Sequence, residues 1–308
     1  MRVILCGKNA TAVRALEILV KRGDQVLVVA VHGDDGRDGW QPSLAAAADR
    51  LGAAWVAPRR VNAPDATAQL AAFSPDRLVS IQYDQILRRE FFAAIGCPCL
   101  NLHFALLPRH RGVAPIAWAL LEGDREAGVT LHHMVVDIDG GDVIAQRAVP
   151  IAPEDTAREV YDRVCDASVR LFAESHPFPD ALLAQRRAQD ARGACYHRQG
   201  DFDFSQRRVP WKRPAEELQR WLRAMIFPPM QRPEFTTGRR RLEVVRVAGA
   251  IGGPTSAPPG TVVAASDAGL EVAAGDRTLW LRELADPADA ARTSAELVRS
   301  IEPCAQLG

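Results

Sequence analysis

The sequence has no excess of either charge. Its 308 residues include 38 lysines and arginines and 38 aspartates and glutamates, so the formal net charge at pH 7 is zero. Lysine itself is scarce and occurs only at positions 8, 21 and 212. A protein that grips a polyanion usually carries a basic excess on one face or one domain. The charge balance therefore disfavours a nucleic-acid partner, although it does not exclude one.

Long apolar runs and paired cysteines are also missing. Nowhere do about 18 apolar residues follow one another, and the start M-R-V-I-L-C-G lacks the segments of a signal peptide. We therefore expect a soluble, cytoplasmic protein with no membrane partner. The six cysteines form no C-x-x-C pair, which argues against a structural zinc site or a disulfide framework. Cys97 and Cys99 are the nearest pair, and we expect both to be core thiols.

What is present is a regular alternation of apolar runs and helical periodicity. Short apolar runs predict strands at 3–6, 26–31, 53–56, 77–81 and 97–101, and helical spacing predicts helices at 10–21, 44–51, 66–73, 114–121 and 156–175. This pattern predicts an α/β domain with a Rossmann-like, mostly parallel sheet, followed by a hairpin at 129–134 and 142–149. The first turn, G-K-N-A-T-A, does not match G-x-G-x-x-G, so NAD is not implied.

The last third of the chain differs from the rest. Residues 185–213 are polar, rich in arginine and poorly periodic, which we interpret as a linker. A helix is predicted at 215–225, and short apolar runs separated by glycine turns then predict a small β-barrel of OB type. We expect two domains, a catalytic domain at 1–200 and an OB-like domain at 201–308.

Two polar side chains follow the apolar run that ends at Leu100. Asn101 and His103 are alternate residues, so in extended geometry they project to the same side. In open α/β sheets, ligands bind beyond the carboxyl ends of the strands. A carboxylate would orient the imidazole, and the tight loop I-D-G-G-D offers Asp139 or Asp142. Alternatively, these residues satisfy the backbone groups of a turn.

The wider pattern resembles a known family. N-L-H-x-x-L-L-P-x-x-R-G-x-A-P-I-x-W-A-L, then G-V-T-L-H-x-M and D-x-D-G-G-D, is similar to the 10-formyltetrahydrofolate-dependent formyltransferases. Within them it resembles the branch of methionyl-tRNA and sugar N-formyltransferases, whose C-terminal OB-like domain matches P-P-G-T-V-V and G-L-E-V-A-A-G-D. Two related enzymes are weaker matches to this sequence. Glycinamide ribonucleotide formyltransferase lacks the A-P-I-x-W-A segment, and formyltetrahydrofolate hydrolase normally carries a regulatory domain before the catalytic one. A non-enzymatic folate-binding module would not need the three catalytic side chains.

The resemblance implies a catalytic trio and a co-substrate. It assigns catalysis to Asn101, His103 and Asp139, with 10-formyltetrahydrofolate as formyl donor and no metal. Asn101 would donate a hydrogen bond to the formyl oxygen, and His103 would accept the amine proton, with Asp139 favouring its charged form. The residues that the resemblance implies for folate binding are Gln85, Ile86, Leu87, Arg111, Val136, Asp137, Ile138 and Asp142. Ile86 and Leu87 are equally well explained as core residues.

The acceptor amine is the open question. The loop H-G-D-D-G-R-D-G-W-Q-P-S carries three aspartates and one arginine, whereas tRNA-acting members carry a long basic loop there. This favours a small amine, most of all an amino sugar, over initiator methionyl-tRNA, although R-R-R at 239–241 favours RNA. Trp40 and Tyr83 are candidates for stacking on the acceptor, or else they cover the core. Phe104 stands where the family has a small residue, so we expect it to shape the acceptor side of the site, and Ala105 stands where the family has serine. Whether two subunits pair is left open.

Overall fold

The computed structural model describes residues 1–308, and the chain folds into two compact units. The first unit contains residues 1–115, 127–149 and 163–198, and the second contains 116–126, 150–162 and 199–308. The domain boundary that we expect near residue 200 remains a proposal. No helix of the chain is both long and apolar enough to cross a membrane.

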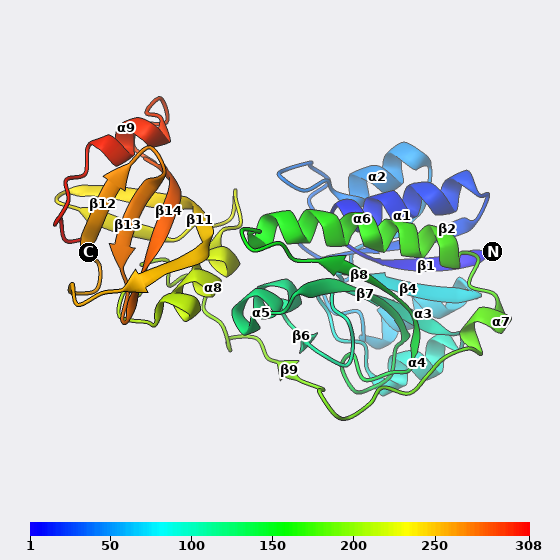
Figure 1. Ribbon diagram of the computed structural model, residues 1–308. Coiled ribbons are helices and arrows are strands. Elements are labelled where there is room, and N and C mark those ends of the chain that lie inside the picture. Colours follow the sequence, from blue (N-terminus) through cyan, green and yellow to red (C-terminus); the bar gives the residue numbers. More distant parts are fainter. The chain divides into compact units, whose positions relative to one another are not determined.

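The first unit is built on a seven-stranded sheet in the order β3-β2-β1-β4-β5-β7-β8 (Figure 1). Its strands are β1 (Arg2–Gly7), β2 (Gln25–Ala30), β3 (Ala54–Val56), β4 (Arg77–Ile81), β5 (Cys99–His103), β7 (Glu126–His133) and β8 (Val143–Pro150). The first five strands in this order, β3-β2-β1-β4-β5, pair in parallel, whereas β5 and β7 pair antiparallel. The predicted fold class, an α/β sheet that is mostly parallel, is confirmed.

Helices cover both faces of this sheet. They are α1 (Asn9–Lys21), α2 (Leu44–Leu51), α3 (Pro64–Ala72), α4 (Arg89–Ile95), α6 (Ala157–Ser175) and the short α7 (Asp180–Leu183). In Figure 1, α1, α2 and α6 lie on one face, with α3 and α4 on the other. Alternate strand residues, among them Ile4 and Cys6 of β1, pack with Phe91 and Ile95 of α4 in one buried cluster. These contacts bury the apolar face of α4, which the sequence pattern did not predict.

The strand order changes direction between β1 and β4. The chain proceeds from β1 to β2 and β3 on one side, then crosses back to add β4 and β5 on the other. Ligands in open α/β sheets bind beyond the carboxyl ends of the strands at such a switch point. Gly7 ends β1 there, and a Cβ at this residue would approach Ile81 O of β4 to 2.7 Å. The close approach of the two strand ends therefore requires glycine.

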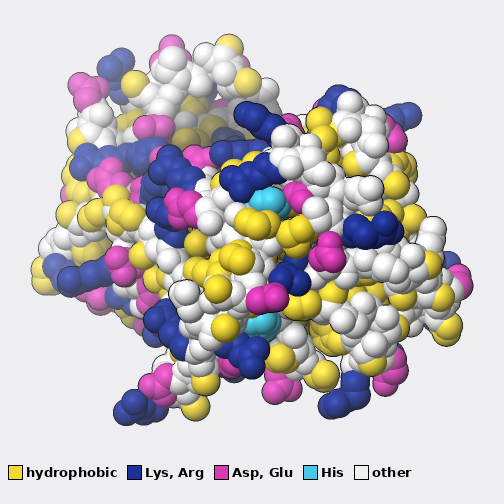
Figure 2. Space-filling model, turned by 90° about the vertical axis from the view of Figure 1, so that its right-hand side faces the viewer, with side chains coloured by type: hydrophobic (Ala, Val, Ile, Leu, Met, Phe, Trp, Pro, Cys, Tyr) yellow, Lys and Arg dark blue, Asp and Glu magenta, His cyan; other side chains and the backbone are white.

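Basic and acidic side chains alternate on the surface that Figure 2 presents. Lysines and arginines (dark blue) stand beside aspartates and glutamates (magenta), with hydrophobic side chains between them. Ion pairs in the first unit join α1 to α6 through Arg14 and Asp166 at 2.6 Å, and β4 to α7 through Arg77 and Asp180. The interspersed charges agree with the zero net charge of the chain.

The second unit contains a five-stranded antiparallel sheet in the order β10-β11-β14-β13-β12. Its elements are α5 (Pro115–Glu122), α8 (Ala215–Met225), β10 (Glu234–Thr237), β11 (Arg240–Pro254), β12 (Val262–Ser266), β13 (Gly269–Ala273), β14 (Arg277–Ala285) and α9 (Ser294–Arg299). The pairing of β11 with β14 slips four times, as expected of a strongly curved strand. This half-barrel bears out the predicted OB-like domain.

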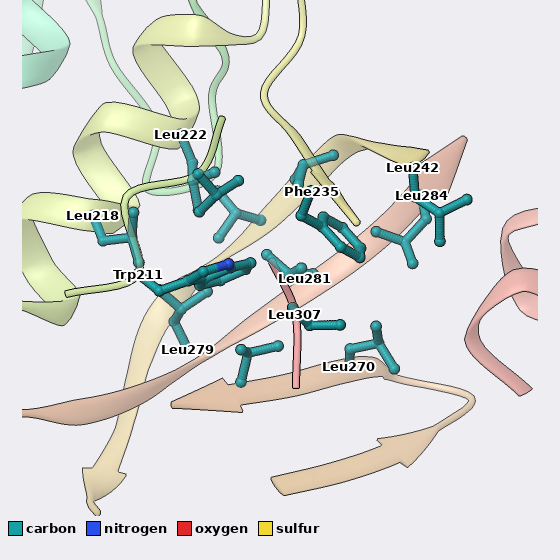
Figure 3. Close-up of a cluster of buried hydrophobic side chains, with 14 of the residues drawn as sticks. Trp211, Leu218, Leu222, Phe235, Leu242, Leu270, Leu279, Leu281, Leu284 and Leu307 are labelled. Carbon is teal, nitrogen blue, oxygen red and sulfur yellow. The ribbon is translucent and has the colours of Figure 1, made fainter. Parts of the chain in front are cut away.

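The core of the half-barrel forms where α8 packs on the sheet (Figure 3). Leu218 and Leu222, four residues apart on α8, are fully buried against Leu279 and Leu281 of β14. Figure 3 shows Trp211 beside these leucines, with Phe235 between it and Leu242. Their ring centroids are 6.0 Å apart in an edge-to-face arrangement, which adds to the stabilisation from buried area.

Candidate active site

Asn101 and His103 lie at the carboxyl end of β5, as their alternation predicts. In the sheet Asn101 pairs with His132 of β7, and His103 pairs with Thr130. The two strands therefore present two pairs of polar side chains at the same edge. His103 and His132 are buried, with exposed fractions of 7% and 2%. A polar cluster this deep must be satisfied internally because water cannot reach it.

The carboxylate of Asp139 connects this cluster. Its Oδ1 accepts a hydrogen bond from Asn101 Nδ2 at 3.2 Å, and its Oδ2 accepts one from the Gly112 amide at 2.8 Å. The same Oδ2 lies 3.4 Å from His103 Nδ1. Asp139 has φ +52, a left-handed conformation that Asp and Asn tolerate better than most residues. The structure thus brings together the three side chains for which catalysis is predicted.

The other aspartate of the loop points elsewhere. Asp142 forms an ion pair with Arg186 at 3.3 Å, and both side chains are exposed. Its backbone carbonyl accepts a hydrogen bond from the His133 amide. Of the two carboxylates that the sequence offers, the one beside His103 is that of Asp139.

Burial and hydrogen bonding set the charge states of this cluster. Burial lowers the pKa of His103, while the negative charge of Asp139 and the His110 carbonyl oppose that shift without cancelling it. Burial alone would raise the pKa of Asp139, but His103, His132 and the Gly112 amide together lower it far below its usual value. The site therefore sets an ionised carboxylate beside an imidazole whose neutral, proton-accepting form burial favours.

Three further residues of the site were not predicted. His132 faces Asn101 Nδ2 at 3.2 Å through Nε2, while its Nδ1 lies 2.8 Å from the His133 carbonyl. Gln189 donates from Nε2 to the carbonyls of Asp139 and Gly141, both at 2.7 Å. The His110 carbonyl lies 2.8 Å from His103 Nε2. His132 could have been found from the sequence, because T-L-H repeats on β7 the polar alternation of N-L-H on β5.

Arg111 is not positioned as a free cation. Its guanidinium donates two hydrogen bonds to Gln189 Oε1, at 3.0 and 2.7 Å. Because Gln189 in turn holds the loop that carries Asp139, Arg111 supports this loop in the structure. The sequence predicts a contact with a folate carboxylate instead, and a ligand would have to displace Gln189 to make one.

The predicted folate-binding residues after β4 have different environments. Gln85 bridges a neighbouring loop: its Oε1 accepts from the Val61 amide and its Nε2 donates to the Pro58 carbonyl, both at 2.9 Å. Leu87 belongs to the core with 4% exposure, whereas Ile86 is 62% exposed. Of these three side chains, only that of Ile86 is free to pack on a ligand.

The predicted residues of the aspartate loop are more accessible. Val136 is 49% exposed, Asp137 is exposed and Ile138 is half-buried. The Gly140 amide donates to the Asp137 carbonyl at 3.0 Å, which closes the turn before β8. These three residues remain proposed folate contacts.

The three residues predicted to contact the acceptor also differ in how far they are buried. Trp40 is 42% exposed on the loop after β2, and Phe104 is 7% exposed. Tyr83 packs against the core cluster of β1, β4 and α4, and its hydroxyl lies 3.2 Å from Gln85 Nε2. Burial, with the nearby Cys6 and Asp84, raises the pKa of Tyr83. Tyr83 and Phe104 therefore fit the core interpretation better than stacking on a ligand.

Comparisons with known proteins agree with this site. Residues 2–175 match the family model described as formyl transferase, and residues 203–301 match that of the formyl transferase C-terminal domain. A methionyl-tRNA formyltransferase of Thiobacillus denitrificans is 35% identical over 289 residues, covering 92% of this chain and 91% of that protein. One from Bacillus subtilis is 29% identical and covers 96% and 93%.

Solved structures share the fold. An N-formyltransferase of Helicobacter canadensis, in complex with folinic acid and dTDP-3-aminofucose, has a TM-score of 0.71 at 22% identity and covers 91% of this chain and 98% of that one. A sugar 3N-formyl transferase, WlaRD, has a TM-score of 0.70 at 22% identity, with coverage of 92% and 97%.

The chain belongs to the formyl transferase family. The family confirms the expected enzyme class and co-substrate: the protein is a formyltransferase whose donor is 10-formyltetrahydrofolate. The acceptor is not decided by these likenesses, because the sequence relatives are named for methionyl-tRNA and the structural neighbours for sugars.

Exchanging the two loop carboxylates for amides separates their roles. Asp139→Asn is expected to lower turnover by about 10²-fold, because the neutral amide no longer favours the charged form of His103. With saturating donor, Asp142→Asn, the matched control, should change turnover little, since Asp142 forms an exposed ion pair with Arg186 that contributes at most about 1 kcal/mol. Turnover measured on both purified variants checks this prediction. A larger loss in Asp142→Asn than in Asp139→Asn would assign the carboxylate role to Asp142.

Proposed function

We propose that the protein transfers the formyl group of 10-formyltetrahydrofolate to the primary amine of a small acceptor, an amino sugar in a nucleotide-linked or natural-product form. The observation that carries this proposal is the distribution of charge on the two parts of the chain that would have to hold RNA: the loop after β2 and the half-barrel. A tRNA acceptor needs phosphates neutralised by several free cations. The loop carries three aspartates to one arginine, and seven of the fourteen arginines at 199–308 form ion pairs with carboxylates.

Hydrogen bonds hold two of the aspartates in the loop after β2. Asp34 accepts hydrogen bonds from the amides of Leu44 and Ala45 at 2.9 and 3.0 Å, at the start of α2. Asp38 accepts from the Ser43 amide at 2.8 Å. An anion at a helix N-terminus is favoured by the helix dipole. These two carboxylates hold the conformation of the loop, so they are not free to turn away from a phosphate backbone.

The arginines of the half-barrel form ion pairs within their own unit. Arg240 pairs with Asp286 at 3.0 Å, and Arg241 pairs with Glu234 at 3.7 Å. Further pairs join Arg207 to Glu234 and Glu243, Arg232 to Glu243, Arg246 to Glu159 and Glu283, and Arg299 to Asp267. The R-R-R run is thus largely compensated, which weakens the main sequence argument for RNA.

The proposed reaction uses the three side chains in distinct roles. The amine nitrogen attacks the formyl carbon, so a new C–N bond forms as the bond from carbon to N10 of the folate breaks. His103 takes a proton from the amine and delivers it to N10, which leaves as the amine of tetrahydrofolate. Asn101 donates a hydrogen bond to the formyl oxygen while that atom carries negative charge.

The contacts of the site support this sequence of steps. In imidazolium form, His103 would donate from both nitrogens, to Asp139 Oδ2 and to the His110 carbonyl. The acceptor amine replaces that carbonyl as the partner of Nε2 when it binds. The Asn101 amide carries two N–H groups, now facing Asp139 and His132, and one of them turns to the formyl oxygen.

Initiator methionyl-tRNA is the second candidate acceptor. The observation that favours it is the name of the sequence relatives, since methionyl-tRNA formyltransferases match almost the whole chain at up to 35% identity. The two candidate reactions share the donor and the catalytic trio, so they differ only in the molecule that carries the acceptor amine.

An acceptor assay separates the two candidates. Purified protein with 10-formyltetrahydrofolate is expected to formylate amino-sugar nucleotides and release tetrahydrofolate stoichiometrically, with negligible transfer to initiator methionyl-tRNA at moderate salt. The measurement is tetrahydrofolate release across a panel of amines, repeated at rising salt, because binding to phosphates weakens steeply with salt. Efficient and salt-sensitive formylation of methionyl-tRNA would establish the second candidate instead.

A further inference from the structure

A second cluster of titratable side chains lies beside the site, and the proposed formyl transfer assigns these side chains no role. It contains His110, from the segment after β5, and Cys195 and His197, from the polar segment predicted as a linker. That prediction was wrong in part, because the segment contains β9 (Tyr196–His197), which pairs in parallel with β6 (Arg111–Gly112). The pairing places the three side chains together although they are up to 87 residues apart in the chain.

The backbone holds the two segments in close register. The Arg111 amide donates to the Cys195 carbonyl, and the Val113 amide donates to the His197 carbonyl, both at 3.0 Å. Gly112 has φ +89, and a Cβ on it would collide with the His197 carbonyl. The close approach of β6 and β9 therefore requires glycine at this position. The backbone pairing of β6 with β9 therefore holds the residues of the cluster next to one another.

The spacing of the ligand atoms fits a tetrahedral metal ion. Nδ1 of His110 lies 3.1 Å from Nε2 of His197 and 3.6 Å from Sγ of Cys195, and the ligand atoms of all three residues lie within 4.8 Å of one another. Zinc binds imidazole nitrogen at about 2.0–2.1 Å and thiolate sulfur at about 2.3 Å. In a tetrahedron those bonds separate two nitrogens by roughly 3.3 Å and a nitrogen from sulfur by roughly 3.6 Å.

The two imidazoles are buried, and a backbone contact holds the thiol beside them. His110 and His197 are 3% and 8% exposed, and their rings stack with centroids 5.4 Å apart. The His110 amide donates to Cys195 Sγ at 3.0 Å, which fixes the sulfur beside His110. Two buried imidazoles that face each other through nitrogen can share one proton at most, whereas a metal ion engages both lone pairs.

We propose that His110, Cys195 and His197 bind one divalent transition-metal ion with the preferences of zinc. Binding forms one metal–sulfur and two metal–nitrogen bonds and releases the thiol proton of Cys195. Water or another donor takes the fourth position. Imidazole and thiolate ligands select zinc and related ions over magnesium and calcium, which prefer oxygen. The C-x-x-C rule does not detect such a site, because its ligands come from distant segments.

The site acts on the catalytic cluster through the backbone. The His110 carbonyl contacts His103 Nε2 at 2.8 Å, and the Gly112 amide donates to Asp139 at 2.8 Å. The metal therefore holds the segment whose Gly112 amide orients Asp139 and whose His110 carbonyl contacts His103 before the acceptor binds, without contact with the reacting atoms. It has a structural role, which is compatible with a formyl transfer that needs no metal.

Metal titration of the whole chain tests this proposal independently of the acceptor. After treatment with a chelator, the protein is titrated with Zn²⁺ or Co²⁺ alone. We expect one ion per chain, a thiolate-to-cobalt charge-transfer absorption and a raised Tm, since an ion that binds the native state stabilises it. A wild-type chain that takes up no ion, or a cobalt complex without the thiolate absorption, would overturn the proposal.

Variants assign the ligands. Cys195→Ser and His197→Ala are each expected to weaken Zn²⁺ binding by at least about 10²-fold, because losing even an outer-shell partner costs up to about 10²-fold. Cys304→Ser is the matched control, since Cys304 is an exposed free cysteine and should leave binding unchanged. Binding equal in all four proteins would place the ion elsewhere and refute the assignment. Should a ligand variant fold poorly, the wild-type titration still decides.

Discussion

His103→Ala is expected to lower turnover by roughly 10²–10⁴-fold, the usual contribution of a positioned proton-transfer group. The imidazole lies 3.4 Å from Asp139 and is 7% exposed, so it is held beside the carboxylate that favours its charged form. The measurement is kcat for tetrahydrofolate release with saturating donor. Unchanged turnover would remove His103 from the mechanism.

His176→Ala provides a matched control. His176 is also a buried histidine paired with an aspartate, Asp24, at 2.6 Å, and its side chain is 5% exposed. Its ring contacts Arg22, at the end of α1, and Asp24, which are not residues of the catalytic cluster. Its loss should lower Tm while kcat stays near the wild-type value. A fall in kcat equal to that of His103→Ala would mean that both variants act through stability alone.

The pH profile gives a second measure of the same role. A base works in its neutral form, so activity falls as pH decreases through the pKa of His103. Because burial lowers that pKa, the acid limb of kcat is expected below about 6.5, the ordinary value for histidine. The charge of Asp139 raises the pKa of His103, so Asp139→Asn should move the acid limb to still lower pH.

The parts of the fold that could be predicted are those with local signals. The alternation of apolar runs with helical spacing predicted the parallel strands, and α8 was predicted with its observed bounds. The helix α4 was missed because seven residues give less than two full turns of periodicity. Strand β10 was missed because only one of its four residues, E-F-T-T, has a fully buried side chain. A single apolar residue shows no alternating pattern.

The site was predictable only where its residues carried a pattern. N-L-H and the aspartate loop are local, and they led directly to Asn101, His103 and Asp139. Gln189 lies in a polar segment without periodicity, and its partner Asp139 is 50 residues away. No local rule connects the two. The metal-ligand cluster is hidden for the same reason, since a short two-residue pairing is what brings His110 to His197.

Asn101→Ala is expected to lower kcat by about 10²–10³-fold, or about 3 kcal/mol, with the affinity for folate nearly constant. Asn101 pairs with Ser80 of β4 and His132 of β7 near the carboxyl end of β5, and its Nδ2 faces Asp139 and His132. If it donates a hydrogen bond to the formyl oxygen, its contribution appears only as that oxygen gains charge. Folate affinity measured by calorimetry and kcat measured by tetrahydrofolate release separate these terms.

The same substitution also removes a partner of Asp139, and this second effect must be distinguished from the first. Asn101 Nδ2 holds Asp139 Oδ1 at 3.2 Å, so its loss could act by displacing the carboxylate from His103. Displacement would shift the acid limb of the pH profile in the direction of Asp139→Asn, whereas loss of an oxyanion donor lowers kcat at every pH. In a double-mutant cycle, separate roles give nearly additive losses for Asn101→Ala and Asp139→Asn. A double variant no slower than Asp139→Asn alone, with the shifted acid limb already present in Asn101→Ala, would make Asn101 a positioning residue and leave the formyl oxygen without its proposed donor.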